Sequence, residues 1–288
     1  MDINTILLVA AALAPAFALC VYLFKKDRVE KEPMGLLMKL FVFGALSSLP
    51  VLICEILMSK FINATFVNLF GLGVMDRFVN YLYVAADVFI GVALVEEGFK
   101  WLTLVWLTKQ NKAFNCFFDG MVYAIFVSLG FAALENVLYV LNNGWANAVS
   151  RAILSVPGHM FFAVMMGYYY SRWNILEKAH KAEKWFASKG YIKIRQGGFN
   201  YKKSKKLSLF VPILFHGTYN FCCMVGESWA IIAFLAFVVF MYVHCFKRIK
   251  ETSNSDATNE EYITTIVLRK YPELPEIIKA REEVTEIN

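Results

Sequence analysis

The chain has 288 residues, of which 58% are hydrophobic and 18% are charged, and its mean hydropathy is +0.51. Soluble domains are usually about 45–50% apolar, so this composition excludes an ordinary soluble domain and predicts a multi-pass membrane protein. The net charge of +6 comes mainly from Lys and Arg in short segments beside apolar runs. It therefore does not indicate nucleic-acid binding.

Seven apolar runs are long enough to cross a bilayer, which takes about 20 residues for one helix. They cover roughly residues 4–24, 35–58, 79–108, 117–141, 149–171, 207–226 and 228–246. The first run is followed, not preceded, by basic residues, which is the reverse of a secretory signal peptide, so we interpret it as a retained span. The third run is long and is expected to tilt, extend beyond the bilayer or break near Gly91. The sequence thus predicts an all-α, polytopic helical membrane bundle.

The placement of Lys and Arg predicts the orientation of the bundle. Most of them lie in four segments, at 25–31, 109–112, 172–206 and from 247 onward. The opposite set of loops holds only Lys60, Arg77 and Arg151. We therefore expect the N-terminus outside and the C-terminus in the cytoplasm, with a transmembrane domain over 1–246 and a cytoplasmic tail over 247–288.

Two adjacent carboxylates and a lysine lie inside the third apolar run, at Glu96, Glu97 and Lys100. A charge at the centre of a membrane helix costs roughly 2.5–3.5 kcal/mol, so pairing or chemistry must offset three of them. Glu96 and Lys100 share a helix face, and Glu97 lies about 100° round the helix. Lys100 can neutralise one carboxylate, and the second, desolvated beside a like charge, suits a general base.

Four further polar side chains lie in later apolar runs, at Glu135, His159, His216 and Asn220. Glu135 could form an interhelical ion pair, tune the other glutamates or ligate a metal. A lone histidine in a span is often only an interhelical hydrogen bond. Three glutamates and two histidines at comparable depths, however, predict one catalytic cluster.

The polar groups alone are also compatible with two other classes of protein. Buried Glu, His and Lys also build the proton relays of proton-coupled transporters, although the chain shows no inverted repeat. A non-catalytic membrane scaffold would use the same groups only to hold helices together.

The ordered set Glu96-Glu97-x-x-Lys100, Phe131-x-x-x-Glu135, His159 and His216-x-x-x-Asn220 resembles the PrsW family of intramembrane proteases. That family is grouped with the CAAX prenyl endopeptidases and with bacteriocin-processing or abortive-infection proteases. The Lys after the glutamate pair favours PrsW over the CAAX branch, which usually has Arg one position later. The resemblance covers about residues 1–246. One departure is Ser155, where the superfamily motif has Phe four residues before its histidine.

The resemblance implies hydrolysis of a peptide bond in or beside the cell membrane. Glu96 would activate water, His159 would orient it, and Glu97 and Glu135 would support the site. His216 and Asn220 would stabilise the tetrahedral oxyanion.

A competing mechanism places Zn²⁺ on His159, His216 and Glu135 with a glutamate as the base. The chain has no HExxH motif. We therefore expect a metal-independent mechanism with no cofactor. In PrsW proper, the implied task is site-1 cleavage of a membrane-anchored anti-sigma factor. The expected partners are a membrane-anchored protein substrate and the lipid bilayer, not nucleic acid.

Overall fold

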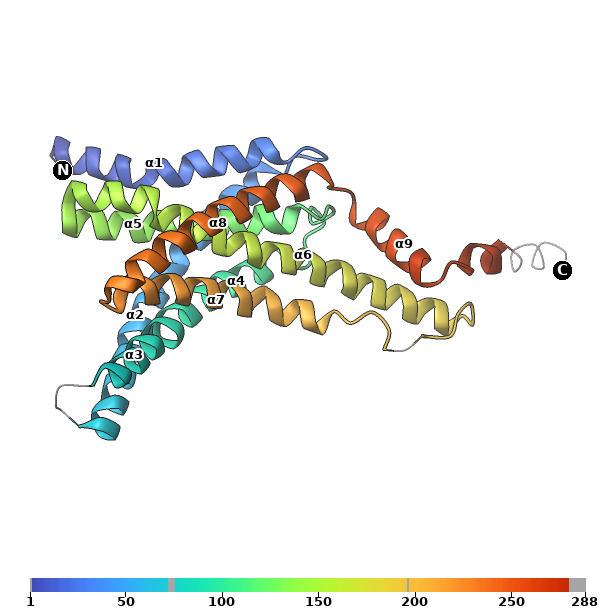
Figure 1. Ribbon diagram of the computed structural model, residues 1–288. Coiled ribbons are helices and arrows are strands. Elements are labelled where there is room, and N and C mark those ends of the chain that lie inside the picture. Colours follow the sequence, from blue (N-terminus) through green and yellow to red (C-terminus); the bar gives the residue numbers. More distant parts are fainter. Residues whose placement is uncertain (1, 72–75, 196, 280–288) are drawn as a thin grey trace.

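The protein is described here by a computed structural model that covers residues 2–71, 76–195 and 197–279, and it is a helical bundle (Figure 1). The described residues form no strands, which confirms the all-α prediction. In chain order the elements are α1 (Ile3–Lys26), α2 (Met34–Phe70), α3 (Arg77–Ala86), the π-helical η1 (Asp87–Ala93), α4 (Leu94–Thr108), α5 (Asp119–Ile153), α6 (Ser155–Ser188), α7 (Lys202–Met224), α8 (Ser228–Asn254) and α9 (Asn259–Lys270).

Among the described residues, six helical stretches are long and apolar enough to cross a membrane. One of them, Asp119–Ser188, joins α5 to α6. It turns back at Gly144, whose φ of 74° is not helical. Beyond this turn, Arg151 donates to the Asn136 side chain at 2.9 Å, whereas a straight helix would hold these residues about 22 Å apart. The turn agrees with the two spans predicted for this stretch, while the number that crosses a bilayer stays a prediction.

Several helices continue past the predicted spans. α2 runs to Phe70, α6 to Ser188 and α8 to Asn254, so the boundary predicted at residue 246 falls inside α8. The division into two domains stays a prediction, and residues 280–288 of the predicted tail lie outside the described residues. The start of α1 and the end of α9 lie at opposite ends of the molecule (Figure 1).

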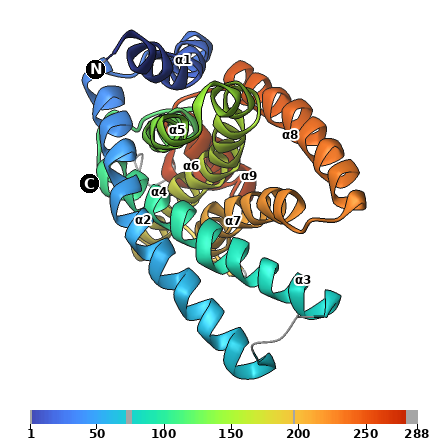
Figure 2. The same cartoon turned by 90° about the vertical axis from the view of Figure 1, so that its left-hand side faces the viewer.

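The first half of α5 is the centre of the bundle. Every residue from Phe118 to Ala133 is buried. In Figure 2, α5 and α6 lie inside a ring made by α1, α2, α4, α7 and α8. Glycines bring α2 and α5 into backbone contact, because a Cβ at Gly44 would lie 2.1 Å from the Val127 carbonyl oxygen. A Cβ at Gly130 would likewise lie 2.0 Å from the Phe41 oxygen. Small residues serve this purpose where membrane helices pack closely.

The long third span is continuous but changes its helical form at η1. This segment contains Gly91, close to where a break was expected, and the N–H of Leu94 donates to the oxygen of Phe89, five residues earlier. Such π-turns are rare and occur often at functional sites. The segment also packs against α7 at Gly217, where a Cβ would lie 2.2 Å from the Phe89 ring. The wide turn therefore lies between two helices that carry predicted site residues.

Hydrogen bonds of polar groups join the loops around the start of α5 to that helix. The Tyr123 hydroxyl donates to Glu32 at 2.5 Å, and Asp256 accepts from the N–H of Phe118 at 2.9 Å. Burial raises the pKa of Glu32 to about 7 and that of Asp256 to about 6. Asp119 accepts from the N–H of the preceding residues 115 and 116. None of these side chains lines the cavity described below.

Candidate active site

A cavity of about 750 Å³ opens among α2, η1, α4, α5, α6, α7 and α8. Five of the six predicted site residues line it: Glu96, Glu135, His159, His216 and Asn220. The exposed Asn142 and Asn143, just before the Gly144 turn, also line it. The cavity thus reaches toward the end of the bundle where the N-terminus lies (Figure 1).

Lys100 lies at the centre of the polar groups. Its Nζ donates to Glu96 Oε2 at 2.9 Å, to Glu97 Oε1 at 2.8 Å and to His159 Nδ1 at 3.0 Å. An ammonium has three protons, so these three acceptors use all of them. The Nζ also lies 4.2 Å from the centroid of the Phe131 ring, a cation–π contact. This contact gives the phenylalanine of the Phe131-x-x-x-Glu135 motif a physical role.

The contact with Lys100 determines the tautomer of His159. Because Lys100 has no lone pair to offer, His159 Nδ1 must be the acceptor, and the ring proton lies on Nε2. Nε2–H then donates to Glu135 Oε2 at 2.9 Å. The same carboxylate pairs with Arg151 at 2.9 Å. Glu135 is therefore linked to Lys100 only through the imidazole, and its direct cationic partner is Arg151.

His216 is held by the second glutamate of the pair. Its Nδ1 lies 3.0 Å from Glu97 Oε1, and the Phe162 ring stacks on the imidazole with centroids 4.7 Å apart. Since a carboxylate accepts, Nδ1 carries the proton, and Nε2 remains for the cavity that His216 lines. Asn220 lines the same cavity one turn further along α7.

Burial separates the two adjacent glutamates. Glu97 is 0% exposed and does not line the cavity, while Glu96 is 4% exposed and does. Glu97 therefore lies behind the site, bound to Lys100 and His216. Of this pair, only Glu96 offers a carboxylate to a molecule in the cavity.

Two charged residues of the cavity were not among the predicted site residues. Glu55 of α2 lines the cavity together with Glu96, so a second carboxylate faces the same space. Arg151 lines it as well and holds Glu135, although the sequence suggested only a loop cation. A signal was present for Glu55, because the burial cost that singled out Glu96 applies equally to a lone carboxylate in the second apolar run.

Donor atoms of Glu96, Glu97 and His159 lie within 4.8 Å of one another, so this group could hold a metal ion. It shares only His159 with the predicted zinc set of His159, His216 and Glu135. The Lys100 ammonium contacts all three of its members at 2.8–3.0 Å and so takes the place of a cation. Zinc binds these ligand types at about 2.0–2.2 Å, so metal and ammonium cannot share that place. The arrangement does not fit a metal while Lys100 stays there.

Comparisons with known proteins agree with one another. A family model described as "PrsW family intramembrane metalloprotease" matches residues 32–245. A protein named Protease PrsW from Oceanobacillus iheyensis is 31% identical over 253 residues, covering 88% of this chain and 99% of the relative. Protease PrsW from Bacillus subtilis is 29% identical over 245 residues, covering 85% and 94%. The protein of that name from Clostridioides difficile is 29% identical over 235 residues, covering 80% and 85%. No solved structure matches.

Proposed function

The chain belongs to the PrsW family of intramembrane proteases, and on that premise we propose that Glu96 activates the water molecule that attacks the peptide bond. The protein is a multi-pass membrane protease, and this membership favours it over the proton-coupled transporter and the non-catalytic scaffold. The observation that carries the proposal is that Glu96 faces the cavity while its neighbour Glu97 is enclosed. A general base must reach the proton that it abstracts, so access decides between the two.

The neighbouring groups have complementary tasks in this proposal. Lys100, which packs on the Phe131 ring, holds the Glu96 carboxylate in place. Glu97 orients His216, whose imidazole would stabilise the developing oxyanion together with the Asn220 amide. His159, fixed between Lys100 and Glu135, would orient the water or the substrate carbonyl.

We further propose that the reaction needs no metal ion. The family model carries the word metalloprotease, and the Glu96, Glu97 and His159 donors could hold an ion. The Lys100 ammonium supports the metal-independent alternative, because it already supplies the positive charge among those donors. The zinc alternative would require Lys100 to leave a position in which it is 0% exposed.

The proposed substrate is a membrane-anchored protein, with an anti-sigma factor cut at site 1 as the candidate within the family. The position of the cavity supports cleavage near the end of the bundle where the N-terminus lies, beside Asn142 and Asn143. The proposed relation to the CAAX and abortive-infection proteases rests on the ordered set of motifs alone.

Cleavage of a membrane-anchored reporter by purified variants tests the proposal. Glu96→Gln keeps size and hydrogen bonding but removes the base, so the rate should fall by at least about 10²-fold. The matched control is Glu260→Gln, an exposed glutamate of α9, which should leave the rate unchanged. A chelator should leave the wild-type rate unchanged, whereas a zinc enzyme would lose activity and regain it with Zn²⁺. Full activity of Glu96→Gln would refute Glu96 as the base, and chelator inhibition reversed by Zn²⁺ would refute the metal-independent mechanism.

A further inference from the structure

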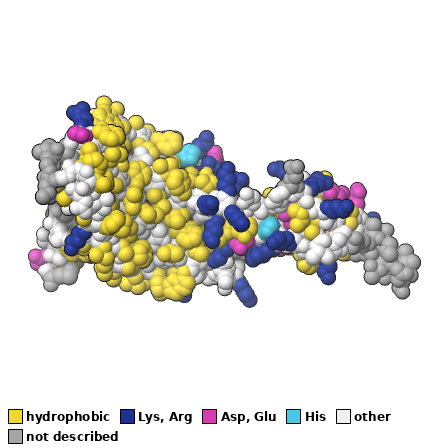
Figure 3. Space-filling model, turned by 90° about the horizontal axis from the view of Figure 1, so that it is seen from below, with side chains coloured by type: hydrophobic (Ala, Val, Ile, Leu, Met, Phe, Trp, Pro, Cys, Tyr) yellow, Lys and Arg dark blue, Asp and Glu magenta, His cyan; other side chains and the backbone are white. Residues whose placement is uncertain are grey.

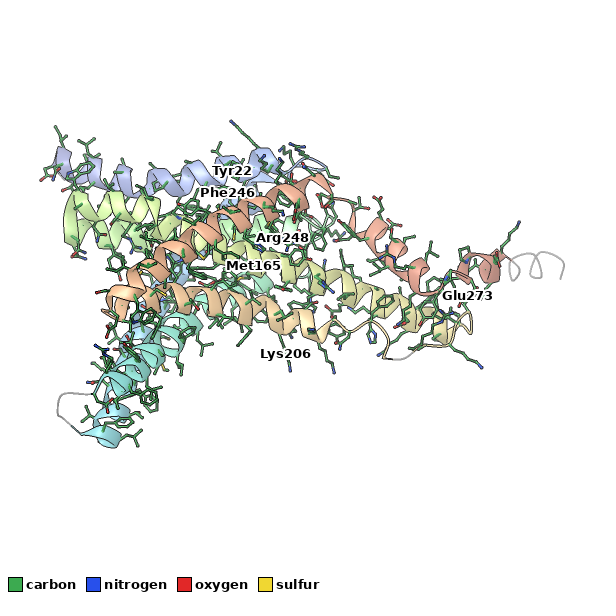
Figure 4. All side chains as sticks on the ribbon, in the orientation of Figure 1. Tyr22, Met165, Lys206, Phe246, Arg248 and Glu273 are labelled. Atoms are coloured by element: carbon green, nitrogen blue, oxygen red, sulfur yellow. The ribbon has the colours of Figure 1, made fainter. Side chains whose placement is uncertain are left out.

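A second hollow, of about 470 Å³, lies away from the active-site cavity, among α6, α8 and α9. The two hollows have no lining residue in common. Arg172 of α6 and Arg248 of α8 both line it, and Tyr262 and Ile266 of α9 complete it. Figure 4 shows Arg248 where α8 passes α6.

The charge of this hollow is not balanced by the protein. Among the described residues, neither Arg172 nor Arg248 has an ion-pair partner, and the Nε of Arg248 is buried without a hydrogen bond. The Arg248 guanidinium lies 4.8 Å from the Tyr168 ring. The one carboxylate in the lining, Glu251, is exposed and faces Lys247 at 3.8 Å. Two guanidinium groups therefore line one hollow, and neither has a carboxylate partner for its N–H donors among the described residues.

The hollow lies where the apolar surface of the bundle ends. Arg172 and Arg248 each follow directly on a predicted span, at 149–171 and 228–246. Between one and just over two turns before Arg248, α8 exposes the apolar side chains of Phe240 and Val243, which are 50% and 65% exposed. Figure 3 shows the hydrophobic surface giving way to a band of Lys and Arg. A group bound here would have its polar part at the arginines, at the edge of that apolar surface.

We propose that this hollow binds the phosphate-bearing headgroup of an anionic membrane lipid. A guanidinium presents paired N–H donors that match phosphate oxygens, and two of them can hold one phosphate from both sides. The buried Thr252 in the lining adds a hydroxyl donor. Basic hollows between membrane helices at the cytoplasmic boundary are suited to such headgroups. A free phosphate shares this chemistry, but the apolar surface of α8 beside the hollow favours a lipid.

Binding at this place would tie three elements together. The lining from α9 comes from Tyr262 and Ile266, and that from α6 and α8 from the arginines. The lipid would therefore fix the segment after α8 against the bundle. This inference is independent of the proposed proteolytic mechanism, because none of its residues touches the active-site cavity.

Native mass spectrometry of the full-length protein tests the inference. Phosphatidylglycerol should bind at least about tenfold more tightly than zwitterionic phosphatidylcholine, and the Arg172→Gln/Arg248→Gln double variant should lose that preference. Lys250→Gln removes the same charge from an exposed position of α8 that does not line the hollow and is the matched control, expected to bind within about twofold of the wild type. Arg248→Lys keeps the charge but not the paired donors, so its preference for phosphatidylglycerol should lie between those of the double variant and the control.

Several results would overturn the inference. A wild-type protein with no preference for phosphatidylglycerol would do so, and this arm does not depend on the folding of any variant. A double variant that melts like the wild type and keeps the preference would do so as well. Inorganic phosphate that displaces phosphatidylglycerol completely at equal concentration would show an anion site that does not recognise a lipid.

Discussion

Lys100 shows how single residues make a buried charged site tolerable. Its three protons contact two carboxylates of its own helix, α4, and one imidazole nitrogen of α6. Breaking a buried ion pair by removing one partner typically costs about 3–5 kcal/mol, because the other charge is left unpaired. The lysine therefore stabilises the fold and orients the catalytic groups at the same time.

Replacing Lys100 should lower the stability of the protein by that amount. Lys100→Met leaves Glu96 and Glu97 without their cation, so we expect a loss of about 3–5 kcal/mol and a clearly lower melting temperature in detergent. Adding Glu97→Gln should restore part of the loss, because one unpaired charge is then removed. Lys39→Met, on an exposed site of α2, is the control and should change little. Equal melting of Lys100→Met and the wild type would contradict the central role of the ammonium.

At the scale of helices, backbone contact fixes the distance between α2 and α5. α5 supplies Phe131 and Glu135 to the site and α2 supplies Glu55, so a shift between these helices would move both. Gly44 and Gly130 each lie against a carbonyl of the other helix. These two contacts fix the position of α2 along α5.

The two glycines of α2 near its start offer a matched comparison. A Cβ at Gly44 would lie 2.1 Å from a backbone oxygen, whereas one at Gly35 would meet nothing within 4 Å. Gly44→Ala should therefore destabilise the protein by about 1–3 kcal/mol or more, since backbone must move. Gly35→Ala should be neutral or slightly stabilising, because alanine favours a helix. Thermal unfolding in one detergent compares them, and equal melting of the two variants would show that the contact does not constrain the helices.

At the scale of the whole molecule, the two ends of the bundle differ in charge and in access to the cavity. The basic residues lie mainly on one set of loops, and the cavity opens toward the other end, near Asn143. In the predicted orientation, the cavity would receive water and substrate from outside the cell.

Labelling of single cysteines in intact cells measures this orientation. In a variant without the native cysteines, Asn143→Cys should react with a membrane-impermeant maleimide added outside. Lys203→Cys, exposed in the first turn of α7 on the basic side, should react only after the cells are permeabilised. The reverse pattern would invert the predicted topology and place the cavity mouth on the cytoplasmic side.

Much of the fold could be predicted from the sequence, because a bilayer demands long apolar helices. Seven apolar runs and the burial cost of charge were enough to predict a helical membrane bundle and to single out Glu96, Glu97 and Lys100. Their spacing on one helix also indicated that a lysine would hold a carboxylate. These inferences depend only on local composition and helical period, which do not require knowledge of neighbouring helices.

Only the tertiary structure decided how these groups are paired. Glu135 is held by Arg151, which comes back beside it because the chain turns at Gly144. The same packing leaves Glu96 facing the cavity and encloses Glu97, two residues that composition and helical spacing alone do not distinguish. Pairing and access arise from contacts between distant segments, and they depend on helix rotation and approach. A difference of about 100° between adjacent residues on a helix is enough to separate a carboxylate at the cavity from one behind it.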